Sequence, residues 1–179
     1  MPGKLTKLLS EPHFHKVDGA LWGMLHTFSN AEKKVQNFLD GHGIPNYLPC
    51  ITVRNARTDA VSRKLQLKGF IFACWDTRRF PGLAKAGNLL ARDEVHHVST
   101  EPDIMRSMEA YWKLELLSEH YDVEDFNSNE SFASHTIQKG PLAGTIGYVM
   151  KEDGHPVFLL PLDQDHWYAK VHLPAGDFS

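Results

Sequence analysis

Leu21-Trp-Gly-Met-Leu-His-Thr27 is an apolar segment with aromatic and branched side chains, which is typical of a β-strand. It is followed by Ser29-Asn-Ala-Glu32, a capping box that predicts a helix in which Ser29 caps the backbone and Glu32 reaches back to it. Ala31, Val35, Phe38 and Leu39 form one apolar stripe on this helix, and Gly41 and Gly43 provide a left-handed stop. We therefore expect a strand followed by a helix that packs against a sheet.

Two more extended segments follow this helix. Tyr47-Leu-Pro-Cys-Ile-Thr-Val53 contains a proline near its start, which favours a sheet edge or a bulge there. Arg54-Asn-Ala-Arg-Thr-Asp-Ala60 reads as a basic hairpin loop. The aromatic and branched content of Phe70-Ile-Phe-Ala-Cys-Trp75 predicts a central, buried strand.

The segment after that strand predicts two helices with a short strand between them. Pro81 is a favourable first residue for a helix that runs through Leu90. Val95-His-His-Val98 is a short strand candidate, and Thr100-Glu-Pro-Asp103 caps the second helix. That helix carries one apolar stripe, formed by Ile104, Met108, Tyr111, Trp112 and Leu116.

The rear of the chain is acidic and then rich in short, glycine-bounded runs. No Lys or Arg occurs between Leu114 and Gln138, and we interpret residues 119–131 as a self-repelling linker. The runs 147–150, 156–160 and 167–173 predict strands of a small closed barrel. Residues 1–18 have few apolar positions, so we expect an extension with at most one short helix and ordered structure from about Ala20 onwards.

Composition excludes several classes of protein. The chain has 179 residues, of which 42% are hydrophobic, so it fits one medium domain or two small ones rather than a disordered or fibrous protein. Its apolar stretches are too short to span a bilayer, and the N-terminus lacks the apolar region of a signal peptide, which predicts a cytoplasmic protein. The two cysteines, Cys50 and Cys74, are too few for a disulfide framework, so we expect buried free thiols.

Charge is distributed unevenly along the chain. Residues 1–113 hold 16 basic and 11 acidic residues, a net charge of +5, whereas residues 114–179 hold 3 and 11, a net charge of −8. A mildly basic front half suits nucleic acid or an acidic protein surface. Two solvated surfaces of opposite sign explain the same numbers equally well.

Ile137-Gln-Lys-Gly-Pro-Leu-Ala-Gly-Thr-Ile-Gly147 resembles the opening of a KOW module. Its motif glycines and proline (Gly140, Pro141, Gly144 and Gly147) allow tight turns between barrel strands, and we expect Leu142 and Ile146 to supply core. Upstream, Leu21–Glu32, Gly43-Ile-Pro-Asn-Tyr-Leu-Pro49 and Lys68-Gly-Phe-Ile-Phe72 resemble the N-terminal (NGN) domain of the transcription factor NusG. The resemblance covers residues 20–179.

Three departures make the chain more similar to specialised NusG paralogues, such as RfaH and the UpxY group, than to housekeeping NusG. Leu67-Lys-Gly-Phe70 stands where the family has Phe-Pro-Gly-Tyr, and Trp22-Gly23 stands in place of a Trp-Tyr pair. Leu162-Asp-Gln-Asp165 replaces the Ile-Phe-Gly loop, which argues against binding to Rho and to the ribosomal protein NusE. In RfaH the C-terminal module can form a helical hairpin, but here glycine and proline break Thr145–Val149 and Val157–Leu160 and favour strands.

The resemblance implies an α+β fold and a division into domains. Residues 19–118 would form an NGN-type antiparallel sheet flanked by helices, and residues 132–179 an SH3-like KOW barrel after the acidic linker. The implied activity is transcription elongation or antitermination by a monomer that binds the clamp helices of the largest RNA polymerase subunit. The residues implied in docking on polymerase are Trp22, Met24, His26, Leu67, Phe70 and Phe72. Strand alternation allows only part of this set to reach a partner, and the rest must be core.

Basic residues provide a candidate contact with upstream or non-template DNA. They are Lys33, Lys34, Arg54, Arg57, Arg63 and Lys64. A solvated basic face is an equally good interpretation of the same residues. Thr77, Arg78 and Arg79 lie where RfaH-like proteins contact the opposite lobe of polymerase, so position alone makes them candidates for a second contact.

We expect neither a metal site, nor a cofactor, nor catalysis. The 11 histidines form no set with metal-ligand spacing, because adjacent strand histidines such as His96 and His97 point to opposite faces. No Walker loop, dinucleotide fingerprint or nucleophile elbow occurs. Two alternatives to the transcription factor stay open: a KOW-type RNA-binding or ribosome-associated protein, and an enzyme whose site the sequence does not reveal.

Overall fold

The computed structural model describes residues 1–76, 90–96, 101–163, 166–174 and 176–177. The fold is α+β, with antiparallel pairing throughout its four-stranded and five-stranded sheets. The chain divides into two compact units. Phe14–Cys50 and Arg63–Tyr111 form one unit, which we call the front unit; Met1–His13, Ile51–Ser62 and Trp112–Ser179 form the other, the rear unit.

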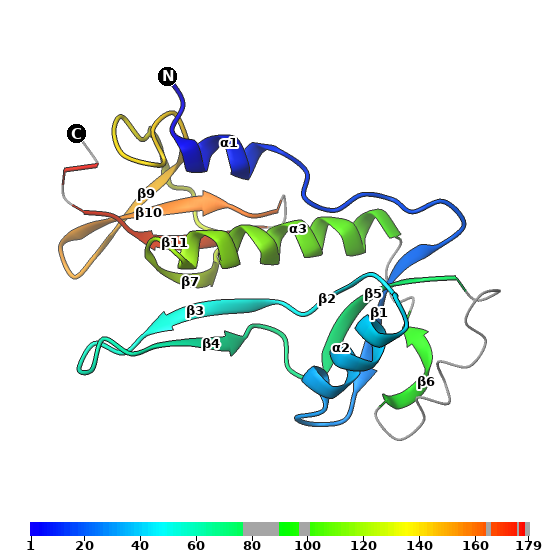
Figure 1. Ribbon diagram of the computed structural model, residues 1–179. Coiled ribbons are helices and arrows are strands. Elements are labelled where there is room, and N and C mark those ends of the chain that lie inside the picture. Colours follow the sequence, from blue (N-terminus) through cyan, green and yellow to red (C-terminus); the bar gives the residue numbers. More distant parts are fainter. Residues whose placement is uncertain (77–89, 97–100, 164–165, 175, 178–179) are drawn as a thin grey trace. The chain divides into compact units, whose positions relative to one another are not determined.

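A four-stranded sheet organises the front unit. Its order is β2-β5-β1-β6, where β1 is Leu21–Thr27, β2 Asn46–Tyr47, β5 Phe70–Trp75 and β6 Leu90–His96 (Figure 1). The predicted strands at 21–27 and 70–75 are confirmed, and β5 is central as expected. The strand expected at 95–98 begins earlier, at Leu90, and its last two residues lie outside the described residues. The helix expected from Pro81 through Leu90 also lies outside the described residues, except for Leu90, which begins β6.

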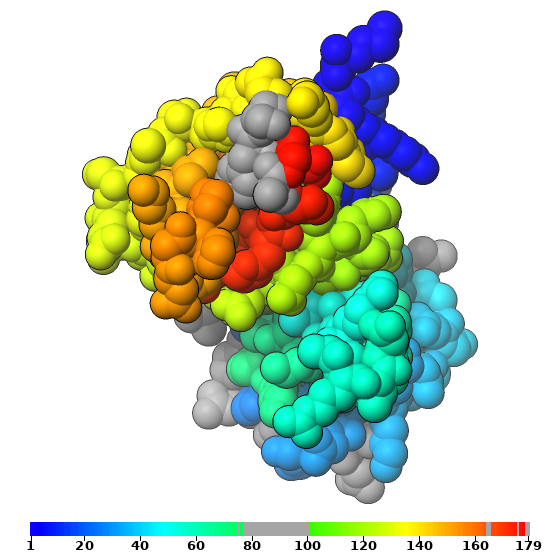
Figure 2. All heavy atoms as spheres, turned by 90° about the vertical axis from the view of Figure 1, so that its left-hand side faces the viewer, coloured from blue at the N-terminus to red at the C-terminus, as the bar shows by residue number. Residues whose placement is uncertain are grey.

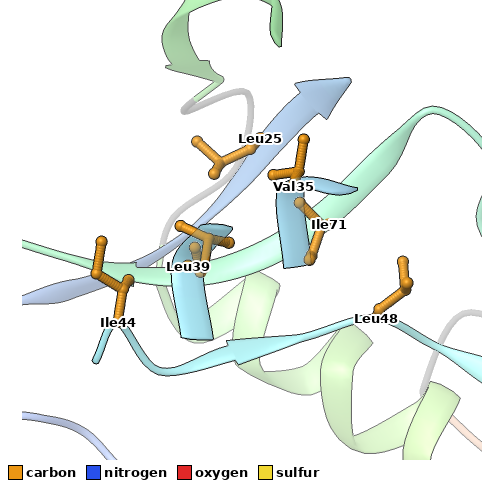
Figure 3. Close-up of a cluster of buried hydrophobic side chains, with 7 residues drawn as sticks. Leu25, Val35, Leu39, Ile44, Leu48 and Ile71 are labelled. Atoms are coloured by element: carbon orange, nitrogen blue, oxygen red, sulfur yellow. The ribbon is translucent and has the colours of Figure 1, made fainter. Parts of the chain in front are cut away.

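One face of this sheet packs against α2 (Glu32–Gly41). Leu25 and Ile71, which are opposite each other in the register, lie in one buried cluster with Val35 and Leu39 of the helix (Figure 3). The predicted apolar stripe is therefore confirmed. Gly43, which follows the C-cap residue His42, has φ +64° and confirms the left-handed stop, whereas Gly41 is the last residue of the helix and has no positive φ.

The predicted capping box at Ser29–Glu32 is wrong. The N-cap is Ala31, without any side-chain cap hydrogen bond, because the chain turns at Asn30 in the left-handed region (φ 61°) and leaves Ser29 outside the helix. The Glu32 side chain points into the protein instead, is only 4% exposed, and accepts a hydrogen bond from the Gly69 N–H at 2.8 Å.

The other face of the sheet packs against α3 (Glu101–Ser118), which contributes its residues 101–111 to the front unit. Trp22, Phe72 and Cys74 form a buried cluster with Ile104 and Met108 of the helix. The predicted stripe on α3 thus faces the sheet at these two positions.

The extended segment predicted at 47–53 is divided in two. β2 ends at Tyr47 and β3 (Cys50–Arg54) begins after Pro49, which cannot donate a ladder hydrogen bond. β3 pairs with β4 (Val61–Leu65) as a separate two-stranded hairpin, so the predicted basic hairpin loop is confirmed.

A five-stranded sheet forms most of the rear unit. Its order is β7-β11-β10-β9-β8, where β7 is Asp122–Asn127, β8 Ala133–Thr136, β9 Ile146–Glu152, β10 His155–Pro161 and β11 Trp167–His172. The three strands expected in this region are confirmed as β9, β10 and β11. Strands rather than helices thus occupy Val157–Leu160 and the part of Thr145–Val149 that begins at Ile146.

The acidic segment 119–131 is not the irregular linker we expected. Residues 122–127 are β7, which pairs along its whole length with β11, so that Val123 lies opposite Val171. β7 is an edge strand in which only Val123 is buried, and its carboxylates Glu124 and Asp125 remain exposed. Charge repulsion is tolerable there because water solvates the outward carboxylates.

Ordered structure also begins well before Ala20. The N-terminal segment contains α1 (Lys4–Ser10), in which Leu5 and Leu9 are buried. The Gly3 N–H donates to the Ala143 carbonyl at 2.7 Å and the Leu5 N–H to the Pro141 carbonyl at 3.0 Å. Figure 2 shows this segment, in blue, against the yellow segment that contains the glycine-rich loop. Residues 1–13 are therefore an integral part of the rear unit.

Candidate partner-docking surface

Five of the six residues implied in polymerase docking lie on one face of the front unit's sheet. The antiparallel register of β1 and β5 places Met24 opposite Phe72 and His26 opposite Phe70, with Trp22 opposite Cys74 at the far end. Because side chains two residues apart in a strand share a face, these three pairs form consecutive rows of one surface. The sixth residue, Leu67, comes from the turn before β5 and packs against the same cluster.

Burial changes along this surface. Trp22 is 5% and Phe72 is 2% exposed, because α3 covers them. These two residues belong to the core. They can support the docking side chains but do not themselves present a surface to a partner, which corrects the direct contact that the resemblance implied for them. Met24, Leu67 and the last row remain half-buried, and the rings of His26 and Phe70 stack with centroids 4.8 Å apart. We call Met24, His26, Leu67 and Phe70 the docking face.

The turn that presents Leu67 and Phe70 is fixed at Gly69. Gly69 has φ +79°, a conformation that favours glycine over other residues. Its N–H donates to Glu32 and its carbonyl accepts the Thr27 N–H, both at 2.8 Å. Glu32 was missed as a site residue. The sequence held a weak signal, since Glu32 lies on the same helical stripe as Val35 and Leu39.

The candidate DNA-binding residues are exposed. Arg54 and Arg57 lie at the hairpin, where the Asn55 side-chain oxygen accepts the N–H groups of Arg57 (2.9 Å) and Thr58 (3.2 Å) and holds the loop in shape. Arg63 and Lys64 are exposed on β4, where strand alternation directs them to opposite faces of the hairpin. The remaining two, Lys33 and Lys34, are exposed on α2, and the Lys33 ammonium donates to the Gln36 side chain at 2.6 Å.

The third group of candidates, Thr77, Arg78 and Arg79, lies outside the described residues. The other predicted groups lie within the described residues.

The glycine-rich loop is a compact turn of the rear unit. Gly140 and Gly144 have φ +77° and +84°, and the Gly144 N–H donates to the Ile137 carbonyl at 2.8 Å. Leu142 is fully buried, as expected. Ile146 is 67% exposed, so its predicted core role is wrong: it begins β9 with its side chain directed to solvent. Gly147 does not have a positive φ, and its role is close packing instead.

The described residues offer little reactive chemistry. Neither Cys50 nor Cys74 is in a disulfide; Cys74 is buried, as expected, whereas Cys50 is half-buried. Burial, and after it the negative charge of Glu101, raises the pKa of the Cys74 thiol, which disfavours the nucleophilic thiolate at neutral pH. Across residues 1–76, 90–96, 101–163, 166–174 and 176–177, no three His, Cys, Asp or Glu side chains lie close enough together to hold a metal ion. In that same part of the chain, no helix combines the length and the apolar character needed to cross a membrane.

Comparison with known proteins gives no family: no protein-family model matches the chain, and no curated protein matches it. The function therefore has to be argued from the docking face and the motifs. Both support the same proposal.

Proposed function

We propose that this protein is a transcription elongation or antitermination factor of the NusG type, which docks on the clamp helices of bacterial RNA polymerase through Met24, His26, Leu67 and Phe70. The observation that carries this proposal is the β1–β5 register. It aligns the motif residues on one sheet face. Trp22 and Phe72 are buried under α3, and the row formed by His26 and Phe70 is half-buried. The NGN domain of such a factor would correspond to the four-stranded sheet with its helices, and the KOW domain to the five-stranded sheet, which begins at Asp122 rather than at residue 132.

The fold is compatible with this assignment. A four-stranded antiparallel sheet has α2 packed on one face and α3 on the other, which is the architecture implied for an NGN domain. The glycine-rich loop connects β8 and β9 within a sheet of five short antiparallel strands, the number that an SH3-like barrel needs. These features support the proposal.

The docking face has the chemistry of a protein-binding hot spot. Binding energy concentrates in a few aromatic and aliphatic side chains that lose their water on contact. Stacking of His26 on Phe70 and the hydrogen bonds at Gly69 hold these side chains in place before binding. Little conformational entropy is then lost on docking.

Phe70→Asp in the full-length chain is expected to weaken binding to bacterial core RNA polymerase by at least about tenfold, since it removes a hot-spot ring and places a charge in an apolar contact. Co-elution on size exclusion and a titration of labelled protein measure this loss.

The matched control is Ile146→Asp. It makes the same change of an apolar side chain to a carboxylate at a residue that is 67% exposed in the rear unit. Binding by the control with loss in Phe70→Asp supports the docking face. Failure of the wild-type chain to bind polymerase contradicts the proposed function, and equal losses in both variants contradict the assignment of the docking face.

The hairpin carries a second proposal, an additional contact with DNA near the polymerase. Residues 50–65 hold four basic side chains and one acidic side chain, Asp59. A two-stranded ribbon exposes side chains on both faces, so Arg63 and Lys64 can reach phosphates on either side. Such contacts add affinity without reading sequence.

Arg57→Glu is expected to weaken DNA binding and to reduce the slope of log affinity against log salt by about 0.9 for each phosphate of duplex DNA that the protein no longer neutralises. Fluorescence anisotropy with a labelled oligonucleotide at several salt concentrations gives this slope. Lys151→Glu, at an exposed residue of β9, changes the net charge equally and serves as the control. Identical slopes for the two variants would argue against a hairpin contact.

The five-stranded sheet is a poor candidate for the alternative, an RNA-binding KOW module. Of its sheet lysines, Lys170 is 8% exposed and pairs with Glu124 at 3.4 Å and with Glu152. The hydrogen bond to Glu152 raises the pKa of Lys170 and keeps it charged, but both partners are carboxylates of the same sheet. A cation neutralised in this way is not available to a phosphate.

A further inference from the structure

The N-terminal segment places an aromatic side chain, Phe14, against the buried cluster that adjoins the docking face. The ring of Phe14 lies edge-on to Trp22, with centroids 5.8 Å apart, and 4.8 Å from the ring of Tyr47. Tyr47 in turn stacks on Phe72, its partner in the β2–β5 register, at 6.2 Å. Phe14 is thus packed on the same sheet face as Met24 and Leu67, within one cluster.

Polar contacts hold the backbone on either side of this ring. The Phe14 N–H donates to the Glu109 side chain at 2.7 Å, and the His15 carbonyl accepts the Trp22 indole N–H at 3.0 Å. The Lys16 ammonium lies 3.5 Å from the Glu101 carboxylate. All of these partners belong to the front unit, on β1 and α3.

Apart from Phe14, the side chains of this segment bury little apolar surface. Between α1 and β1, residues 11–20 contain neither helix nor strand, and His13, His15, Lys16 and Val17 are exposed. Phe14 is therefore the one large apolar anchor of this stretch on the front unit. Segments with few buried apolar contacts open at low free-energy cost.

We propose that Phe14–Lys16 is a self-docked strap that competes with RNA polymerase for the aromatic face of the sheet, an inference that rests on the proposed function. When the strap is closed, its ring occupies the approach to Tyr47 and Phe72 beside Met24 and Leu67. A polymerase helix that packs broadly on this face displaces the ring, and Tyr47 then extends the docking face beside Met24 and Leu67. Binding is weaker while the strap is closed, because the apparent affinity is scaled by the fraction of molecules in which it is open.

Phe14→Ala in the full-length chain is expected to tighten polymerase binding about tenfold, the factor by which a strap open in about one molecule in ten lowers affinity. It should also speed hydrogen exchange of the Trp22 indole N–H, measured by NMR without polymerase. Glu109→Ala removes the backbone anchor from α3 and is expected to act in the same direction with a smaller effect.

His15→Ala is the matched control, because it removes the exposed side chain while the carbonyl that accepts the Trp22 N–H remains. Tighter binding by Phe14→Ala and Glu109→Ala but not by His15→Ala supports the strap. The proposal of a strap is wrong if wild-type and Phe14→Ala proteins bind polymerase equally well, or if hydrogen exchange of the Trp22 indole N–H is unchanged in folded Phe14→Ala. In either case the proposed function stands. If none of the variants nor the wild type binds polymerase, the proposed function fails and competition with polymerase fails with it.

Discussion

Phe158→Ala is expected to lower the free energy of unfolding by about 4 kcal/mol, the cost of deleting a fully buried phenyl ring and leaving a cavity. Phe158 lies in the middle strand of the five-stranded sheet and is 0% exposed. Its register partners are Val149 on one side and Val171 on the other. Because the strands on both sides are fixed, the sheet has little freedom to collapse into the cavity.

Urea unfolding followed by circular dichroism measures this loss. Phe28→Ala makes the same substitution at a residue that is 49% exposed, and its effect is expected to stay within about 0.5 kcal/mol. Equal effects of the two variants would contradict the placement of Phe158 in the core of the rear unit.

Gly147→Ala is expected to destabilise the protein by about 2–3 kcal/mol, as overpacking in a closely packed core does. A Cβ atom at residue 147 would lie 2.5 Å from the Leu159 carbonyl oxygen and 2.5 Å from the edge of the Phe158 ring. The carbonyl belongs to the neighbouring strand β10 and cannot move without disturbing the ladder. The cost is therefore steric, since residue 147 has no positive φ.

Gly41→Ala is the control, because no atom lies within 4 Å of the Cβ position at the end of α2. There the change is expected to stabilise the helix by about 0.5 kcal/mol, because alanine loses less backbone entropy than glycine. The double variant Gly147→Ala/Phe158→Ala should be destabilised by less than the sum of the two single effects, since the ring that clashes is gone. Strict additivity would argue against this contact.

The sequence predicted much of the docking face but not its accessibility. Alternation along Trp22–His26 and Phe70–Phe72 shows which residues share a face of a strand. Which end of that face stays open depends on where α3 lies, and α3 begins about 25 residues after β5 ends. Burial of Trp22 and Phe72 is a consequence of that long-range packing.

The roles of Glu32 and Phe14 were missed for the same reason. Glu32 looked like half of a capping box, yet its hydrogen-bond partner is 37 residues away at Gly69. Phe14 looked like part of a polar extension, and its backbone is held by Glu109, 95 residues away. Motif rules describe neighbours within one or two helical turns, so contacts at this separation do not enter them.

By itself the sequence determined the strands β1, β5, β9, β10 and β11, the stripe of α2 and the left-handed stop after it. Each of these depends on side-chain periodicity or on glycine geometry, which act over a few residues. Only the tertiary structure decided that the acidic segment forms β7 and that residues 1–13 join the rear unit. The same holds for α3 covering one end of the sheet while the other end stays open. These outcomes depend on which surfaces meet and exclude water, a quantity that no single segment contains.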